Sequence, residues 1–171
     1  MKLKDSGKRA EFDTGAVRDC AEGKGRCDLL PLGVLGNLFG DIIFTFIDGY
    51  VRFGGVKLLR AAIKEFSVVY MDECDFYDTS EKKLAHTILE ASKQFEDGMQ
   101  KYGERNWEKG IPLHRYIDSA VRHYLKFLRG DTDEPHDRAF IWNLLCAIWT
   151  HENKPETIDL PFKDRKELHN D

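Results

Sequence analysis

The clearest structural signal in this chain of 171 residues is the stretch from residue 80 to residue 102, SEKKLAHTILEASKQFEDGMQKY. Its apolar side chains recur at intervals of three and four residues, which is typical of an amphipathic helix. The apolar stripe consists of Leu84, Ile88, Ala91, Phe95, Met99 and Tyr102. Thr79 or Ser80 can cap the helix, and Glu81 places an acid in its first turn. The stretch therefore predicts a long helix packed against a core.

Two further helices are predicted downstream of this one. The first runs from about residue 114 to residue 129 and ends at Gly130, because glycine commonly follows the last turn of a helix. The second begins at about residue 134 or 135 and ends at about residue 150. Asp133 is its expected N-cap, and Pro135 suits its first turn.

The segment from residue 33 to residue 66 is the most apolar part of the chain. Apolar residues recur at helical spacing from Leu35 to Ile47, which predicts a buried helix. Glycines such as Gly40 indicate breaks in it, and residues 56–66 predict a second short helix. Since no strand pattern longer than a few residues occurs, the predicted fold class is an all-α helical bundle.

The two ends of the chain are expected to be irregular. Residues 1–32 are polar, charged and rich in glycine, and their composition predicts an extended or partly disordered N-terminal arm. Residues 153–171 predict an irregular tail, and the acidic stretch 71–79 predicts a loop. A length of 171 residues suits one domain, with the helical core over residues 33–152.

The composition argues against several classes of protein. A net charge of -4 argues against binding to polymeric nucleic acid. No run of about 18 apolar residues occurs, so no membrane span is expected. Residues 1–9 have no apolar segment behind them, unlike a signal peptide, so the protein is expected to stay in a cytoplasm. The 4 cysteines include no CxxC pair, which favours free thiols over disulfides or zinc ligands.

An acidic segment, DTDEPHD, spans residues 131–137 and carries the first candidate chemistry. Glu134 and Asp137 are three residues apart, so on a helix they would share a face that continues into the core stripe. Buried carboxylates are costly when unpaired, and a divalent cation such as Mg²⁺ or Mn²⁺ would offset that cost. The alternative is an acidic first turn that complements the helix dipole.

Asp118 is expected on the same side of its helix as Arg115, Arg122 and Arg129. A row of arginines suits phosphate, because the planar guanidinium donates hydrogen bonds in pairs. Asp118 would then orient an arginine or hold a metal. The alternative is a solvated face of ion pairs, which contributes little stability.

One histidine, His123, precedes the acidic segment, and a second, His136, lies within it. His123 and His136 either take part in function or pack in the core, and the order His123, His136, Asp137 partly resembles the HD-type phosphohydrolases. Histidine beside carboxylates can serve as a metal ligand or as a proton carrier.

Other side chains could bind a nucleotide. Tyr102, Asn106 and Trp107 could stack on a base and hydrogen-bond to it, although a loop anchored by a buried indole is an equally common arrangement. Lys24 and Arg26 lie in a glycine-flanked turn and could grip phosphates, but no P-loop pattern is present.

Motifs at both ends of the chain resemble a phage protein family, the dATP/dGTP diphosphohydrolases. The N-terminal motifs are SGKR at 6–9, TGAVRD at 14–19 and KGRCDLLP at 24–31. The downstream motifs are KYG at 101–103, NW at 106–107, RH at 122–123, GD at 130–131, His136 and WN at 142–143. Residues 34–79 carry no motif of this kind.

The resemblance implies a single catalytic domain over residues 1–171 with the all-α nucleoside triphosphate pyrophosphohydrolase fold, assembled as a dimer or tetramer. Such an enzyme would use Mg²⁺ or Mn²⁺ to convert dGTP and dATP into the monophosphate and pyrophosphate. In a phage with 2-aminoadenine DNA, it would act in the host cytoplasm. There dGMP would feed synthesis of the modified base, and loss of dATP would favour that base.

The resemblance and the residue patterns together assign roles. The expected catalytic residues are Glu134, which could accept a proton, Arg122 and His123. The expected substrate-binding residues are Lys24, Arg26, Lys101, Tyr102, Asn106, Trp107 and Asn143. The expected metal ligands are Asp118, Asp131, Glu134, His136 and Asp137.

The resemblance is to MazG-like enzymes, a type of all-α nucleoside triphosphate pyrophosphohydrolase. One departure from the sequence pattern of MazG-like enzymes concerns the metal ligands. Enzymes of that type carry ExxE on one helix and ExxD on the next, and residues 134–137 match ExxD. No true ExxE lies at a suitable distance upstream, where Asp118, Glu96 or Glu90 could substitute. Two other functions remain open: an HD-like phosphohydrolase that releases triphosphate or phosphate, and a non-enzymatic helical protein whose arm binds a partner.

Overall fold

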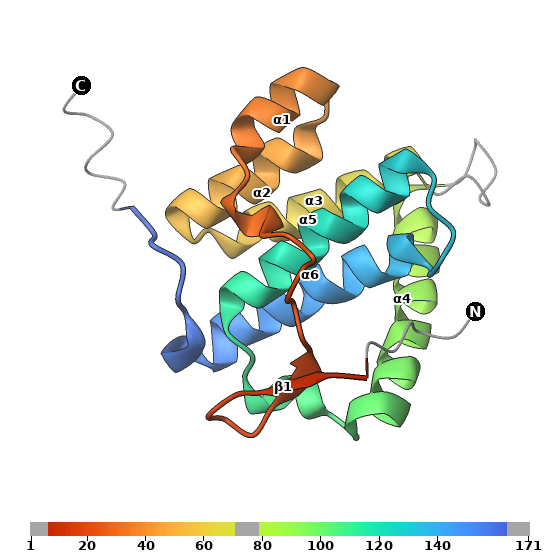
Figure 1. The fold of residues 1–171 in the computed structure, drawn as a ribbon. Coiled ribbons are helices and arrows are strands. Elements are labelled where there is room, and N and C mark those ends of the chain that lie inside the picture. The colour runs from red at the N-terminus through yellow and green to blue at the C-terminus, as the bar shows by residue number, and fades with distance from the viewer. Residues whose placement is uncertain (1–6, 71–78, 164–171) are drawn as a thin grey trace.

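The computed structural model describes residues 7–70 and 79–163, and over these ranges the chain forms a bundle of α-helices (Figure 1). The helices are α1 (Leu32–Phe39), α2 (Ile42–Phe53), α3 (Val56–Tyr70), α4 (Ser80–Tyr102), α5 (Leu113–Arg129) and α6 (His136–Asn153). Three short 3-10 helices connect or follow them: η1 (Cys27–Leu29), η2 (Asn106–Lys109) and η3 (Pro155–Thr157). The predicted all-α class is confirmed.

The centre of the bundle is the pair α5 and α6, which lie side by side with α3 and α4 packed against α6 (Figure 1). Aromatic rings join three of these helices. Phe66 of α3 lies 5.1 Å from Phe140 of α6, centroid to centroid, and Phe140 stacks at 4.8 Å on Tyr124 of α5. All three side chains are fully buried. Burial of such large rings contributes roughly 2 kcal/mol each or more, so it holds α5 and α6 firmly together.

The apolar segment 33–66 forms separate helices with a corner between the first two. Gly40 ends α1 in the left-handed region, with φ at 64°, and the Asp41 side chain caps α2 by accepting from the Ile43 N–H. The predicted break is confirmed. The prediction of one buried helix is wrong at this corner, where Leu38, Phe39 and Ile42 are 76%, 51% and 49% exposed.

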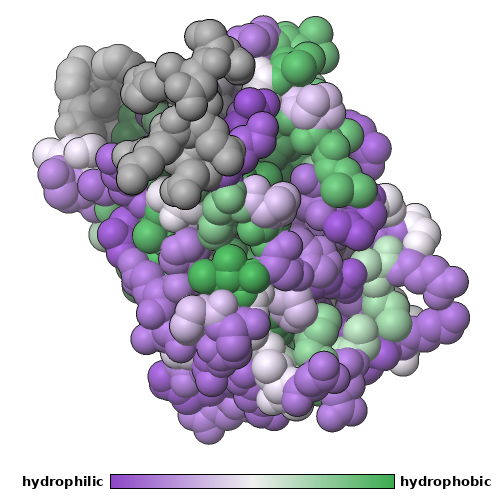
Figure 2. Space-filling model, turned by 90° about the vertical axis from the view of Figure 1, so that its left-hand side faces the viewer, coloured by the Kyte–Doolittle hydropathy of each residue, from purple (hydrophilic) through white to green (hydrophobic). Residues whose placement is uncertain are grey.

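The distribution of hydrophobic residues on the surface agrees with an exposed corner between α1 and α2. Figure 2 shows a mostly hydrophilic face, and its uppermost hydrophobic group lies at the height of α1 in Figure 1. Helical spacing identifies an apolar stripe, but it does not say whether another element covers that stripe. The second short helix, predicted over residues 56–66, is confirmed as α3 and extends to Tyr70.

The long helix α4 has the predicted bounds. Thr79 caps it by accepting a hydrogen bond from the Lys82 N–H at 3.4 Å. The end of α5 is also as predicted, since Gly130 has φ at 81° and its N–H bonds to carbonyls of the last turn. These boundaries depend on local capping, which sequence patterns report well.

The start of α6 differs from the prediction. The helix begins at His136, and Asp133 does not cap it but accepts a hydrogen bond from the His136 ring at 2.8 Å. A residue before proline is disfavoured in helical conformation, so Pro135 keeps Glu134 outside the helix. Glu134 and Asp137 therefore do not share a helical face, contrary to the prediction.

The N-terminal arm, defined here as residues 7–30, has more structure than its composition predicts. Strand β1 (Arg9–Glu11) pairs antiparallel with β2 (Val17–Asp19), with Ala10 opposite Arg18. Strands of three residues are too short for an alternating pattern to register in sequence. In Figure 1 the hairpin lies at the bottom of the view, beside the lower end of α4.

The described part of the tail also departs from the expected irregularity. It contains η3, and the Phe162 ring packs 5.7 Å from Tyr50 of α2. The end of the tail, residues 164–171, and nearly all of the predicted loop at 71–79 lie outside the described residues.

The predictions about thiols and membrane spans concern the whole chain, and the structure addresses most of it. Cys20, Cys27 and Cys146 are free, and Cys74 lies outside the described residues. Within residues 7–70 and 79–163, no helix combines the length and the apolar character that crossing a membrane requires.

Candidate functional site

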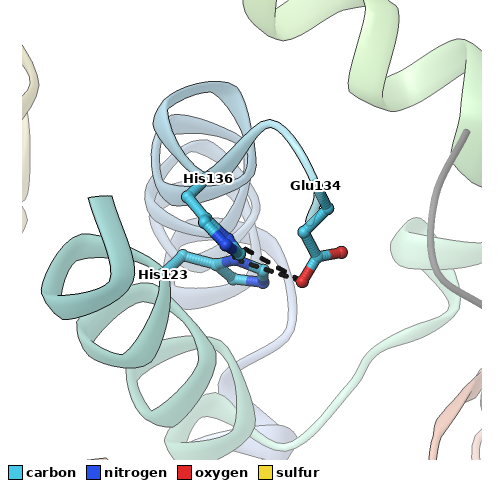
Figure 3. A group of neighbouring side chains, drawn as sticks. All are labelled: His123, Glu134 and His136. Carbon is cyan, nitrogen blue, oxygen red and sulfur yellow. Dashed lines mark hydrogen bonds and ion pairs between the residues drawn. The ribbon is translucent and has the colours of Figure 1, made fainter. Parts of the chain in front are cut away.

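Three side chains meet where α5 leads into α6 (Figure 3). His123 comes from α5, His136 from the first residue of α6, and Glu134 from the connecting turn. The Nδ1 atoms of the two histidines lie 2.9 Å apart, and one oxygen of Glu134 lies 3.8 Å from each of them. The two rings face each other, and the carboxylate points toward both. These three residues are called the His–Glu cluster below.

His136 is held in a defined orientation. Its side chain is 1% exposed, and its Nε2 lies 2.8 Å from a carboxylate oxygen of Asp133. If Nε2 carries the proton, it donates to this carboxylate, and Nδ1 turns a lone pair toward the cluster. The same hydrogen bond to His136 lowers the pKa of Asp133. A carboxylate behind the imidazole is the usual support of a metal-binding histidine.

His123 is kept neutral. Burial, followed by the proximity of His136 and of nearby cations, lowers the pKa of His123 to about 3. Two imidazoles that face each other through Nδ1 can share one proton between these atoms or, when neither Nδ1 carries a proton, can both present lone pairs to a cation. Ligands in adjacent positions of an octahedral ion with bonds of about 2.1 Å are themselves about 3 Å apart. The separation of the two Nδ1 atoms matches this value, so the cluster fits a divalent metal ion.

A second group of potential ligands shares His136. It consists of Asp131, Asp133 and His136, whose ligand atoms lie within 4.8 Å of one another. Both carboxylates in it are already paired with cations. Asp131 accepts hydrogen bonds from Nε and Nη2 of Arg129, and Asp133 lies 3.2 Å from the Lys126 ammonium. This pairing makes the second group a weaker metal site than the His–Glu cluster.

A pocket of about 430 Å³ opens beside the His–Glu cluster, and His123 and Glu134 form part of its wall. Its volume is within the range of small-molecule sites. Aromatic side chains line part of it, namely Phe95, Tyr102, Trp107 and Trp142. The arm, α4, η2, α5 and α6 all contribute to the wall, so the pocket exists only in the folded chain.

Cations outnumber carboxylates in this pocket, although the chain as a whole is acidic. The cations are Arg18, Lys24, Lys101, Arg105, Arg115, Arg122 and Lys126. The carboxylates are Asp19, Asp118 and Glu134. A concentration of positive charge in a concave site attracts anions. The pocket is therefore suited to a ligand that carries phosphate groups.

Arg18 is the most unusual of these cations. Its guanidinium lies over the rings of Tyr116 and Trp142, 5.1 Å and 5.5 Å from their centroids, and one nitrogen donates to the Asn143 side chain. The other terminal nitrogen, Nη1, is buried and has no hydrogen-bond partner within residues 7–70 and 79–163, and burial lowers the pKa of Arg18. No carboxylate among the described residues pairs with it. A buried cation without a counter-charge is costly, and an anionic ligand would offset that cost.

Asp118 and Arg122 connect the arm to α5. The Asp118 carboxylate is 3% exposed, accepts from Arg122, and accepts from the Cys27 N–H at 2.7 Å. Arg122 donates in turn to the carbonyls of Lys24 at 3.1 Å and Gly25 at 3.2 Å. Of the two roles predicted for Asp118, this geometry favours orientation of an arginine, since Asp118 belongs to neither group of potential metal ligands.

The residues predicted to bind a base are already engaged in the fold. The Asn106 amide accepts from the Val17 N–H at 2.9 Å and donates to the Val17 carbonyl at 2.8 Å. The Trp107 ring packs edge-on against Trp149 and Phe95, as in a loop anchored by an indole. Asn143 donates to the Ala139 carbonyl at 2.7 Å and accepts from Arg18. Asn106, Trp107 and Asn143 still line the pocket.

The remaining predicted residues divide between the pocket and the outer surface. Lys24, Lys101 and Tyr102 line the pocket, and Lys101 pairs with Asp19 at 2.7 Å. Arg26 does not line it but pairs with Asp28, and its side chain is 49% exposed. Asp137 is outside the pocket wall and outside both groups of potential metal ligands.

Arg18 and Gln94 are among the pocket residues that sequence reasoning did not assign to the site. Arg18 lies within the TGAVRD motif, so that motif contained a signal. Gln94 follows Thr87 and Ala91 at helical spacing, and all three are buried. Gln94 is not part of the predicted stripe of this helix, so its burial was not visible in the sequence.

An all-α bundle whose cation-lined pocket opens beside a potential metal site has the features of a hydrolase that acts on phosphorylated small molecules. Residues 79–160 match the family model described as dATP/dGTP diphosphohydrolase, N-terminal. Over this segment, which is slightly less than half of the chain, the sequence is similar to the dATP/dGTP diphosphohydrolase family, and this similarity supports a hydrolase. No curated protein and no solved structure matches the chain. The matched segment includes the whole His–Glu cluster and excludes the arm.

Proposed function

We propose that this protein hydrolyses dATP and dGTP to the deoxynucleoside monophosphate and pyrophosphate with the help of a divalent metal ion. The observation that carries the proposal is the position of the His–Glu cluster at the wall of a pocket rich in cations. The family supplies the class of substrate, and the cations supply a place for its triphosphate.

The His–Glu cluster would hold the metal ion. When bound, the ion would polarise phosphate oxygens and make a water molecule more acidic. Of the two ions expected, Mn²⁺ suits two imidazoles and a carboxylate better than Mg²⁺, which prefers oxygen ligands. Asp133 would keep the His136 ring in its binding orientation through the 2.8 Å hydrogen bond.

The protein's own groups account for the other requirements of the reaction. The Glu134 side chain is 15% exposed and lines the pocket, so it can accept the proton of a water that attacks the α-phosphorus. Arg18 and Arg122 would donate to phosphate oxygens and stabilise the charge that develops there. Attack at this atom breaks its bond to the bridging oxygen, which leaves with the β- and γ-phosphates as pyrophosphate.

The biological setting belongs to the same proposal and is supported by the sequence resemblance alone. In a phage that uses 2-aminoadenine, the dGMP formed would feed synthesis of that base, and the removal of dATP would reduce its competitor. The enzyme would act in the host cytoplasm as a dimer or tetramer. The exposed apolar corner between α1 and α2 offers a surface on which copies could assemble.

The test is product analysis with each of the four deoxynucleoside triphosphates, with Mg²⁺, Mn²⁺ or a chelator. We expect dATP and dGTP to give monophosphate and pyrophosphate in equal amounts, faster with Mn²⁺ than with Mg²⁺ and not at all with the chelator. Release of nucleoside and triphosphate would instead support the HD-like alternative. Absence of turnover with every nucleotide and both metals would contradict the proposal.

A further inference from the structure

One buried acceptor in the pocket is unused by the fold. Gln94 lies on α4, is 7% exposed and forms part of the pocket wall. Its Oε1 atom has no hydrogen-bond partner among the described residues. Buried acceptors in native proteins nearly always have a partner, so this oxygen calls for a donor that arrives with a ligand.

A buried donor belongs to another residue of the same pocket wall. The Nε1 atom of Trp142, on α6, also has no hydrogen-bond partner among the described residues. The Trp142 ring lies 5.9 Å from that of Phe95, the residue next to Gln94, and both Gln94 and Trp142 line the pocket. An unused acceptor and an unused donor thus face one pocket among aromatic rings. A flat heterocycle with a polar edge would satisfy both and would stack on the rings.

The other polar groups of the pocket are less suited to a base. Both hydrogen-bonding ends of the Asn106 and Asn143 amides are engaged within the fold. Arg18 retains an unpartnered Nη1, but its uncompensated charge calls for an anion rather than for a neutral ring. Because the Arg18 guanidinium lies over the Trp142 ring, the groups suited to phosphate and those suited to a base adjoin each other in the pocket.

We propose that Gln94 and Trp142 read one edge of the purine, with Gln94 at the substituent on carbon 6 and Trp142 at N7. This inference rests on the proposed function. A carboxamide has an acceptor end and a donor end. Its oxygen can accept from the amino group of adenine, and after the amide plane turns over its nitrogen can donate to the oxo group of guanine. N7 is an acceptor in both purines and is absent from pyrimidines, so Trp142 can donate to either substrate.

The main test uses Gln94→Glu, which keeps the size of the side chain but leaves only acceptors when ionised. At alkaline pH we expect the ratio of kcat/KM for dATP to that for dGTP to rise at least about tenfold, because the carboxylate accepts from adenine and repels the oxo group of guanine. Gln94→Leu should weaken both substrates. The matched control is Gln100→Glu, on an exposed position of the same helix outside the pocket, which should leave the ratio unchanged.

The role of Trp142 is tested with 7-deaza-dATP and 7-deaza-dGTP, which lack the N7 acceptor. The wild-type enzyme should use them about tenfold less well than the parent nucleotides. Trp142→Phe keeps an aromatic ring but removes the N–H. The variant enzyme should therefore have the same kcat/KM for the parent nucleotides as for their 7-deaza analogues. A wild-type enzyme that does not distinguish the analogues would overturn this assignment.

The outcomes separate this inference from the proposed function. If the wild type hydrolyses both purine nucleotides and Gln94→Glu leaves their ratio within about twofold, the inference fails and the function stands. If the wild type binds both without hydrolysis and Gln94→Glu shifts the ratio of their dissociation constants, the inference stands and the function fails. Absence of both binding and turnover overturns both. Circular dichroism of each variant excludes misfolding, and Gln94→Leu replaces Gln94→Glu if the latter does not fold.

Discussion

The N-terminal arm and the α5–α6 hairpin both contribute to the wall of one pocket, and they are held in place by different forces. The hairpin is fixed by large buried rings such as Tyr124 and Phe140. In the arm the fully buried hydrophobic side chain is the small Ala16, and Phe12 and Cys27 are partly buried against the core. Polar contacts across elements, such as those of Val17 with Asn106 and of Cys27 with Asp118, add to these. The His–Glu cluster therefore belongs to the α5–α6 hairpin, which buried rings hold in place. Arg18 and Lys24 belong to the N-terminal arm, whose position depends more on hydrogen bonds.

This difference separates two kinds of functional effect. A change in the hairpin should alter turnover, because the reacting groups must be held in one geometry. A change in the arm should alter substrate binding, because the arm supplies charge at the wall of the pocket. The segment matched by the family model, residues 79–160, includes the hairpin and excludes the arm, so this division also follows the boundary of the match.

The largest effect is expected on the hairpin side, from Glu134→Gln. The substitution keeps the shape of the side chain and removes both a metal ligand and the proton acceptor. We expect kcat for dATP and dGTP to fall by about 10²–10⁴-fold with little change in KM, as is usual when a general base is lost. Steady-state kinetics with saturating Mn²⁺ measure both constants.

The matched control is Glu96→Gln on α4, which is exposed and outside the pocket wall. It should behave as wild type. If Glu96→Gln abolishes turnover while Glu134→Gln retains it, the acid missing from the ExxE pattern lies on α4, and the His–Glu cluster is not the reaction centre.

On the arm side, Arg18→Met should produce two effects of opposite sign. Loss of the buried cation should weaken nucleotide binding by about thirtyfold or more, as for other desolvated charge contacts. It should also raise the melting temperature of the ligand-free protein, because an uncompensated buried charge is removed. Calorimetric titration and thermal unfolding measure the two effects.

Arg26→Met is the control for this prediction, since Arg26 pairs with Asp28 on the exposed side of the arm and surface pairs contribute little. It should leave both quantities near the wild-type values. A fall in the melting temperature of Arg18→Met would show that Arg18 supports the fold rather than the ligand.

A smaller effect is expected where the arm is attached. Asn106→Ala removes both hydrogen bonds to Val17, which should lower the free energy of unfolding by about 1–3 kcal/mol. We expect a higher KM for both nucleotides and a nearly unchanged kcat. Urea denaturation and kinetics test this, with Asn37→Ala, on the exposed surface of α1, as the control. A lower kcat at unchanged KM would contradict the separation between arm and hairpin.

The helices were predictable to different degrees, for local reasons. The bounds of α4 follow from its periodicity and from the Thr79 cap, both of which depend on residues close in sequence. The start of α6 was mispredicted because the effect of Pro135 on the preceding residue was overlooked. The corner at Gly40 was predicted, but the exposure of Leu38 was not, because exposure depends on which elements cover a helix.

The members of the candidate site were more predictable than their arrangement. His123, Glu134 and His136 were all named, but with separate roles and together with Asp118 and Asp137, which lie in neither group of potential metal ligands. Asn106 was predicted to bind a base because its hydrogen-bond partner in the fold could not be recognised from sequence. That partner, Val17, is 89 positions away in the sequence. Spacing along one helix does not reveal which polar groups are already paired across elements.

The periodicity, the caps and the short motifs of the chain were enough to predict the all-α class, the main helix boundaries and the resemblance to a family whose model matches residues 79–160. They act over a few residues, and the sequence displays them directly. The tertiary structure alone decided that two imidazoles and a carboxylate converge, that the arm lines the pocket, and that the unpaired polar atoms there belong to Arg18, Gln94 and Trp142. The reason is that burial and hydrogen-bond satisfaction depend on contacts between segments far apart in the chain.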